Sequence, residues 1–478
     1  MPAAKPTSPT APVVRYHVST ANLARSNVRT FLKGLLGLTI CVIGLSQFIV
    51  LPAEQLIFNG AWDDKIHLKP EPELLKAVIE KHRPEVGPYV EFYRYVHQNP
   101  EISSKEAKTA ELVASHLGKL GYKVSSGIGG HGVVGVMKNG PGKVVLMRAE
   151  LDALPILEQT NVSYRSEHRM IDRYGNERPV MHACGHDMNM AALLMASSLL
   201  KNAFHWWKGT LLVVFQPDEE ETGGAQAMVD DGLYDIVPVP DLMLGQHVVA
   251  DSKAGTIAIR SGPVLVAADS LQARVFGGPC GGANPQRCVD PIPLSMQIVL
   301  GLQDAITQEL GQHEDATVAC WGFHAGEPGN DYVAYADILL DIKTVKPNIR
   351  LRVLEIVKQR FLDECRSAGA PRDPEFNHTV RAPLTTNSDS IAGPLAEVFA
   401  GFFGQSFVDM PFTSACEDFP ILGAAHNIPY AYWNFGGTHP DAEEPVPSNH
   451  SPLFAPEVNL TLRTGSDAMA LAALTFLA

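Results

Sequence analysis

Side chains of types that bind transition metals occur in three short segments of this sequence. Cys184 and His186 lie in HACGHD, Glu219 and Glu220 in QPDEEE, and His247 in LGQH. Thiolate, imidazole and carboxylate are the ligands that zinc takes in proteins, and a further carboxylate can serve as general acid or base. Taken singly, each segment also fits a buried thiol beside a satisfied histidine, or a solvated acidic face. Together the three segments favour a site in which a divalent metal activates water.

Apolar, strand-like runs precede these segments. VVLMRAEL is followed by Asp152, LLVVFQ by the acids of PDEEE, and DLMLGQ by His247, whereas HACGHD leads into a helical stretch over 188–202. Because the carboxyl ends of parallel strands meet at one edge of a sheet, we expect these side chains to converge there. Three acids directly after an all-apolar strand also indicate a cation or another partner, since a buried charge is costly when it is unpaired.

The apolar runs show no alternation and are separated by helical stretches. This pattern predicts an α/β catalytic domain with a largely parallel sheet that is flanked by helices. From residue 262 the order strand, helix, strand, strand, helix, strand predicts an inserted ferredoxin-like satellite domain. We therefore expect a first catalytic segment at 80–261, the satellite domain at 262–382, and a second catalytic segment at 383–478 that completes the catalytic domain.

The N-terminal region predicts attachment to a membrane. Residues 1–30 are rich in Pro, Ala, Ser and Thr and are typical of a disordered arm. Residues 31–53 contain an uncharged apolar run that would extend about 28 Å as a helix, which predicts a transmembrane signal anchor. Basic residues before this run and acidic residues after it predict a cytosolic N-terminus and a lumenal or extracellular catalytic domain. An apolar arm packed on the rest of the chain is the alternative.

Three glycosylation sequons, at Asn161, Asn377 and Asn459, fit the same location and predict a glycoprotein. The net charge of −14 over 478 residues argues against nucleic-acid binding, because phosphate neutralisation needs clustered Lys and Arg. Small molecules or short peptides are the expected partners.

Seven blocks of sequence occur in an order that resembles a known family. The chain is similar to the zinc aminoacylase/carboxypeptidase metallopeptidase family, in the branch of auxin-conjugate amidohydrolases, hippurate hydrolases and N-acyl-amino-acid hydrolases. The resemblance covers roughly residues 85–478. The blocks are VHQNPEISSKEAKTAELVASHLGKLGYKV, RAELDALPILEQT, MHACGHDMNMAALLMA, VVFQPDEEETGGAQAMVDDGL, LGQHV, ACEDFPIL and NHSPLFAPE.

The resemblance implies roles for individual residues. It implies Glu219 as the catalytic acid/base and Asp152 as the acid that orients the site. Candidate substrate contacts are Asn330, Lys343 and Glu417. The implied metal ligands are Cys184, His186, Glu220, His247 and His450. Zinc is the default cation, with manganese or cobalt as alternatives, and one or two ions are expected. A homodimer through the satellite domain is a further implication.

This sequence departs from the family pattern at several positions. Gly281 stands where a histidine normally helps to hold the oxyanion, and losing one such donor costs on the order of 10²–10³ in rate in other hydrolases. Gln286 replaces a second histidine, and Asn189 stands where histidine is frequent. Glu150 replaces the usual Asp, and Lys343 replaces an arginine near the substrate carboxylate, which keeps the charge but loses the bidentate fork.

The leading hypothesis is a metal-dependent amidohydrolase that cleaves the amide bond of an N-acyl amino acid, dipeptide or similar conjugate. Because the metal-binding motifs are intact while the satellite-domain groups are changed, two alternatives stay open. One is non-hydrolytic, metal-dependent acyl transfer or cyclisation. The other is a catalytically silent binding or dimerisation homologue.

Overall fold

The computed structural model describes residues 72–278, 288–310, 316–327, 333–443 and 445–478. The predicted arm at 1–30, the predicted anchor at 31–53, and the candidate residues Gly281, Gln286 and Asn330 lie outside the described residues.

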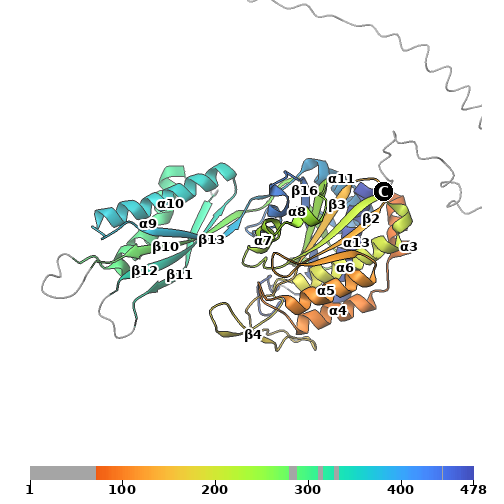
Figure 1. The fold of residues 1–478 in the computed structure, drawn as a ribbon, viewed down its shortest axis with the longest axis horizontal. Coiled ribbons are helices and arrows are strands. Elements are labelled where there is room, and N and C mark those ends of the chain that lie inside the picture. Colours follow the sequence, from red (N-terminus) through yellow and green to blue (C-terminus); the bar gives the residue numbers. More distant parts are fainter. Residues whose placement is uncertain (1–71, 279–287, 311–315, 328–332, 444) are drawn as a thin grey trace, which may run out of the picture. The chain divides into compact units, whose positions relative to one another are not determined.

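A sheet of eight strands forms the centre of the catalytic domain (Figure 1). Strands β6, β3, β7 and β16 run parallel to one another, which confirms the predicted fold class. The edges differ from the prediction, because β1 and β2 form a hairpin and β2 and β8 are antiparallel to their inner neighbours. In spatial order the strands are β1 (Lys123–Ile128), β2 (Gly132–Asn139), β6 (Gly209–Gln216), β3 (Val144–Glu150), β7 (Leu242–Lys253), β16 (Tyr430–Thr438), β8 (Ile257–Ile259) and β15 (Phe407–Asp409).

Helices cover both faces of this sheet. Val145 and Met147 of β3 belong to the core on one face, whereas Leu146 between them belongs to the core on the other. A strand that is buried on both faces has no polar side, which explains the continuous apolar runs. The first face packs against α3 (Pro72–His82), α4 (Gly87–Gln98), α5 (Ala107–Lys119), α6 (His186–Asn202), α11 (Asp389–Phe403) and α13 (Val458–Leu477), and the second against α7 (Gly224–Asp230), α8 (Leu233–Ile236) and α12 (Ile421–Ala424).

The N-terminal helical region consists of three helices, α3, α4 and α5. Pro84 lies between α3 and α4, and Pro100 follows the end of α4. Proline lacks a backbone N–H and clashes with the preceding turn, so the helical hydrogen bonds stop at these points. Gly121 follows the last helix with φ +87°, a conformation that favours glycine at a helix C-terminus.

A second sheet follows in the chain, in the order β11-β12-β10-β13, with every neighbouring pair antiparallel. Two helices pack on it through a core of their own. The chain order is β10 (Ala267–Phe276), α9 (Pro291–Leu310), β11 (Ala316–Ala325), β12 (Tyr335–Thr344), α10 (Pro347–Ser367) and β13 (Glu375–Ala382). This is the βαββαβ order of a ferredoxin-like domain. The chain leaves the catalytic domain after β9 (Gly262–Leu265) and returns to it at β14 (Thr385–Asn387), and these two short strands pair with each other.

No helix within the described ranges is long and apolar enough to cross a membrane. The longest of these helices, α9, α10 and α13, contain charged side chains such as Asp304, Arg352 and Arg463 that interrupt any apolar span. The predictions of a membrane partner, of a lumenal or extracellular location and of a glycoprotein are contradicted by this finding and are withdrawn. The homodimer implied by the resemblance stays a prediction.

Candidate metal centre

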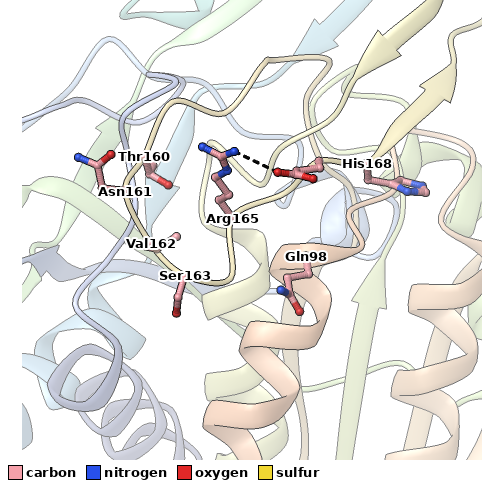
Figure 2. A pocket seen from close by; sticks show the side chains of 8 residues that line it. Gln98, Thr160, Asn161, Val162, Ser163, Arg165 and His168 are labelled. Atoms are coloured by element: carbon pink, nitrogen blue, oxygen red, sulfur yellow. Dashed lines mark hydrogen bonds and ion pairs between the residues drawn. The ribbon is translucent and has the colours of Figure 1, made fainter.

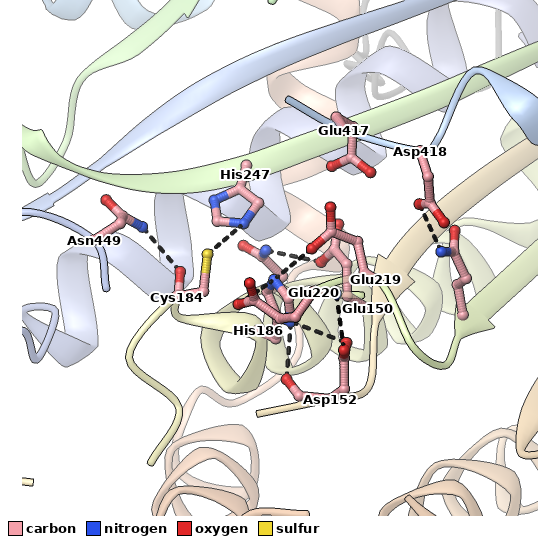
Figure 3. Close-up of polar contacts among 12 residues, drawn as sticks. Glu150, Asp152, Cys184, His186, Glu219, Glu220, His247, Glu417, Asp418 and Asn449 are labelled. Atoms are coloured by element: carbon pink, nitrogen blue, oxygen red, sulfur yellow. Dashed lines mark hydrogen bonds and ion pairs between the residues drawn. The ribbon is translucent and has the colours of Figure 1, made fainter. Parts of the chain in front are cut away.

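The predicted ligands Cys184, His186, Glu220 and His247 lie at the carboxyl edge of the parallel strands (Figure 3). Glu219 and Glu220 follow β6, and Cys184 and His186 lie at the entry to α6. His247 differs from the prediction, because it lies inside β7 rather than after it. The strand continues because the residues that follow His247 pair with β16.

The side chains of all five predicted ligands approach one another. Sγ of Cys184 lies 3.5 Å from Nε2 of His247 and 3.2 Å from Nε2 of His450. Nε2 of His450 lies 3.4 Å from Oε2 of Glu220, and Nε2 of His186 lies 3.9 Å from Oε1 of Glu220. Residues from four separate segments of the sequence therefore meet at one place.

The ligand atoms fit a cation. Within Cys184, His186 and His247, and again within Cys184, Glu220 and His450, the possible ligand atoms all lie within 4.8 Å of one another. Nε2 of His186 and Oε1 of Glu220 are buried and have no hydrogen-bond partner among the described residues. A buried lone pair without a partner costs about 1–3 kcal/mol, and a cation between these two atoms would satisfy both. The mixed S, N and O donor set is one that zinc binds.

The tautomers of two histidines are fixed for metal binding. Nδ1 of His186 donates to the backbone carbonyl of Asp152 at 2.9 Å, and Nδ1 of His247 donates to that of Val248 at 2.8 Å. Each ring therefore keeps a proton on Nδ1 and turns Nε2 toward the cluster, where the Nε2 lone pair would be available to a metal ion. A hydrogen bond from the other ring nitrogen is the usual way in which proteins orient a metal-binding imidazole.

Asp152 connects several elements of the cluster, as its predicted orienting role requires. Its Oδ2 accepts hydrogen bonds from Oγ of Ser103 at 2.7 Å and from the backbone N–H of Glu220 at 3.0 Å. Burial would raise the pKa of Asp152, but the neighbouring His186 ring and these hydrogen bonds hold it below its usual value. Asp152 is therefore an anion that fixes the backbone of the loop carrying Glu220.

Glu219 lies beside the cluster, with one carboxylate oxygen 3.7 Å from Nε2 of His186. Burial raises the pKa of Glu219 well above its usual value, and the charges of Glu417 and Glu220 raise it further. A carboxyl group with a raised pKa next to a metal centre can both accept and release a proton near neutral pH.

His450 reaches the cluster through an unusual backbone conformation. Its φ is +66°, in the left-handed region that few residues other than glycine adopt, and its N–H donates to the carbonyl of Ala183 at 2.8 Å. Strain of this kind persists where the surrounding structure fixes it, frequently at functional sites.

A buried charge network lies next to the cluster, and the sequence alone did not identify it. The guanidinium of Arg148 forms ion pairs with Glu150, Glu417 and Asp418, and it is fully buried. Glu417, which was a candidate substrate contact, is 2% exposed and also accepts a hydrogen bond from the hydroxyl of Tyr432 at 3.1 Å. The signal in the sequence was the position of Arg148, a charged residue that follows four apolar residues inside strand β3.

Two of the departures from the family pattern are in direct contact. Nδ2 of Asn189 donates to Oε2 of Glu150 at 2.9 Å. Glu150, where the family usually has Asp, is thus in contact with Asn189, where the family frequently has His. Lys343 is partly exposed, and its Nζ donates to the carbonyl of Ser414 at 3.0 Å.

A second buried network supports the first turn of α6. Nδ1 of His97 lies 2.6 Å from Oδ2 of Asp187, and its Nε2 lies 3.1 Å from Oε1 of Glu158. Burial would lower the pKa of His97, but hydrogen bonds to Asp187 and Glu158 raise it to about 9. His97 is therefore a buried imidazolium that joins two carboxylates, one of them next to His186.

This raised pKa predicts a pH-dependent contribution to stability. The pKa of His97 is higher in the folded protein than in the unfolded chain, where it is about 6.5. Protonated His97 therefore contributes fully to the stability of the folded state below about pH 6.5, and this contribution is lost as the pH rises through about 9. We expect the free energy of unfolding of the wild type to fall across this pH range. The fall should exceed that of His97→Gln by about 3 kcal/mol. Urea unfolding of both proteins between pH 6 and 10 measures the difference, and parallel curves would show that His97 is neutral in the folded protein.

A cavity of about 670 Å³ lies outside the cluster (Figure 2). Gln98 at the end of α4 and the loop 160–168 line it, including Arg165 and His168. None of the candidate ligands lines this cavity. The adjoining loop does contact the segment that carries His450, because the N–H of Gln159 donates to the carbonyl of Pro452 at 2.8 Å.

Comparisons with known proteins agree with this geometry. Residues 146–460 match the sequence profile of peptidase family M20/M25/M40. A hippurate hydrolase of Campylobacter jejuni is 32% identical over 355 residues, which cover 72% of this chain and 88% of that protein. An N-acetyl-L-cysteine deacetylase of Bacillus subtilis is 29% identical over 355 residues, with coverage of 72% and 80%.

The solved structure of a Bacillus subtilis protein, described as a dinuclear metal-binding peptidase of the M20 family, superposes on this chain with a TM-score of 0.64 and 25% sequence identity. The match covers 84% of this chain and 98% of the Bacillus subtilis chain. The resemblance inferred from the motifs is confirmed. This chain therefore belongs to peptidase family M20/M25/M40 and is a hydrolase that acts on amide bonds.

Proposed function

We propose that this protein hydrolyses the amide bond between an acyl group and an amino acid, at a centre of two divalent metal ions. The observation that carries the proposal is the pair of buried, unpartnered atoms, Nε2 of His186 and Oε1 of Glu220, within a cluster of thiol, imidazole and carboxylate groups. Cys184, His247 and His450 complete the proposed ligand set.

The balance of buried charge supports two ions rather than one. The only buried guanidinium among the described residues of this region is that of Arg148. The carboxylate side chains around it are each no more than 9% exposed: Glu150, Asp152, Glu219, Glu220, Glu417 and Asp418. Such an excess of buried negative charge requires protons or cations, and two divalent ions would offset most of it.

Zinc fits the donor set best, because a thiolate and three imidazoles are soft or borderline ligands. Manganese or cobalt would also bind a site with mixed oxygen, nitrogen and sulfur donors. A bound divalent ion would make water more acidic and an amide carbonyl more electrophilic.

The residues of this chain would then handle the protons. Glu219 would take a proton from the attacking water and deliver it to the nitrogen of the leaving amine. Asp152 would keep His186 and the backbone of Glu220 in place through the hydrogen bonds described above.

The substrate class follows from the relatives and from Lys343. The names of the two curated relatives, hippurate hydrolase and N-acetyl-L-cysteine deacetylase, both describe release of an acyl group from an amino acid. The ammonium group of Lys343 is partly exposed and is a suitable partner for the carboxylate of such a substrate.

A metal titration combined with a substrate panel tests the proposal. The protein is freed of metal with a chelator, reloaded with zinc, manganese or cobalt, and assayed for release of amino acid from N-benzoyl, N-acetyl and indole-3-acetyl amino acids. We expect no hydrolysis without metal, recovery on reloading, and a stoichiometry of two ions that falls in His186→Ala. A wild-type protein that binds no divalent ion would exclude the proposal.

A further inference from the structure

The strand that carries His247 has an open edge next to the cluster. Strand β7 pairs with β3 only as far as Gly245, whereas its pairing with β16 continues past His247. Val248 and Ala250 are two residues apart on the strand, so their N–H groups point to the same edge, the one that β3 has left. Unpaired backbone N–H groups in a buried position need other partners.

Two asparagine side chains supply these partners. Oδ1 of Asn189, on α6, accepts from the N–H of Val248 at 3.0 Å. Oδ1 of Asn449, next to His450, accepts from the N–H of Ala250 at 2.9 Å. We call Asn189 and Asn449 the amide clamp, because together they replace the missing neighbour of β7.

Asn449 makes two further bonds that reach other ligand segments. Its Nδ2 donates to the carbonyl of Cys184 at 2.9 Å and to that of Val248 at 3.1 Å. One side chain thus joins the segment of Cys184, the strand of His247 and the segment of His450. All three hydrogen bonds of Asn449 require the same orientation of its amide. With Oδ1 and Nδ2 exchanged, a donor would face the N–H of Ala250 and an acceptor would face the two carbonyls.

The carbonyl of Val248 is the point at which the clamp acts on His247. This oxygen accepts from Nδ1 of His247 at 2.8 Å, the bond that orients the ring and fixes its tautomer. The N–H of the same residue is held by Asn189, which also donates to Glu150. Movement of the Val248 backbone would therefore turn the imidazole away from Cys184.

We infer that Asn189 and Asn449 are positioning residues that hold His247, Cys184 and His450 at the spacing needed for metal binding. This inference rests on the proposed metal centre. Both residues would act through the backbone and not as ligands themselves. Loss of such an outer partner of a ligand typically weakens metal affinity by about 10–100-fold.

The chain offers a matched control in Asn387. This buried amide also makes three bonds to backbone groups, donating to the carbonyls of Arg260 and Tyr432 at 2.8 Å each and accepting from the N–H of Tyr432 at 2.7 Å. None of its partners is a proposed ligand. Asn387→Ala therefore removes three side-chain-to-backbone hydrogen bonds of the same kind, at a place outside the ligand segments.

Zinc affinity of the metal-free protein, measured by competition with a chromophoric chelator, tests the inference together with the free energy of unfolding. We expect Asn449→Ala and Asn189→Ala to bind zinc about 10–100-fold more weakly, and Asn387→Ala to lose stability with zinc affinity within about twofold of wild type. Asn449→Asp keeps the acceptor for Ala250 and loses the donors to Cys184 and Val248, so it should resemble Asn449→Ala.

Cobalt loading gives a second readout. The thiolate-to-cobalt absorption reports the bond to Cys184, and we expect it to shift or weaken in Asn449→Ala but not in Asn387→Ala. If Asn189→Ala does not fold, Asn449→Ala decides the matter, because Asn449 is only half-buried. Unchanged zinc affinity in a folded Asn449→Ala would overturn the clamp, whereas failure of the wild type and of Asn387→Ala to bind metal would overturn the metal centre itself.

Discussion

Replacing Glu219 with glutamine is expected to lower kcat for amide hydrolysis by about 10²–10⁴-fold, the usual contribution of a positioned acid/base. Glutamine has nearly the same size and can still form hydrogen bonds, but it cannot accept a proton from water. The Glu219 carboxylate also lies within 4.8 Å of the ligand atoms of His186 and Glu220, but it is outside both groups built around Cys184. Since glutamine keeps an oxygen at the same position, the zinc content should stay at the wild-type value. Steady-state kinetics on an N-acyl amino acid, with metal analysis of the same samples, measures both quantities.

Glu221 provides the control for this substitution. It is two residues further along the same loop, but it is partly exposed and paired with Arg173. Glu221→Gln should retain kcat within a small factor. A Glu219→Gln enzyme with normal kcat would remove Glu219 from the mechanism, and one that has lost its metal would reassign Glu219 as a ligand.

Replacing Arg148 with methionine is expected to destabilise the protein by about 3–5 kcal/mol, because the change leaves buried carboxylates without their cation. Methionine is of similar length, so the loss of packing is small. The destabilisation should be greater at pH 8 than at pH 5. Without the guanidinium, the pKa values of the neighbouring carboxylates rise, and their protonation at low pH removes the uncompensated charge.

Urea unfolding of the metal-free protein at both pH values measures this effect. Arg366→Met is the control, since its ion pair with Asp373 is exposed to solvent and therefore screened. Equal stability of Arg148→Met and Arg366→Met at pH 8 would mean that the buried carboxylates are already neutral in the native protein.

Most residues of the candidate cluster could be singled out from the sequence, because they lie in short motifs at the ends of apolar strands. Cys184 and His186 share one tripeptide, and Glu219 and Glu220 are adjacent, so two motifs contribute four candidate residues, although only the three segments together favour a metal site. His450 has no such neighbour and was found only through resemblance. The parallel sheet was predictable for a related reason, since strands buried on both faces have a distinctive composition.

The network around Arg148 was not predictable in the same way. Arg148 and Glu417 are separated by 269 positions in the sequence, and no local pattern connects them. From the resemblance, Glu417 was instead predicted to contact the substrate. Asn449 was missed for a similar reason. All three of its hydrogen bonds are to backbone groups, and the sequence does not show which backbone groups a side chain will contact.

The position of β16 in the sheet has a consequence for synthesis of the chain on the ribosome. This strand, Tyr430–Thr438, lies between β7 (Leu242–Lys253) and β8 (Ile257–Ile259), both of which are made before the whole satellite domain. Until it emerges, the apolar edge of β7 has no neighbour, and an open edge of that kind readily pairs with other chains. The nascent protein therefore passes through a long interval with an incomplete sheet, in which chaperones are expected to bind it. The ligand cluster is completed late as well, because His450 lies 12 residues beyond Thr438, the last residue of β16.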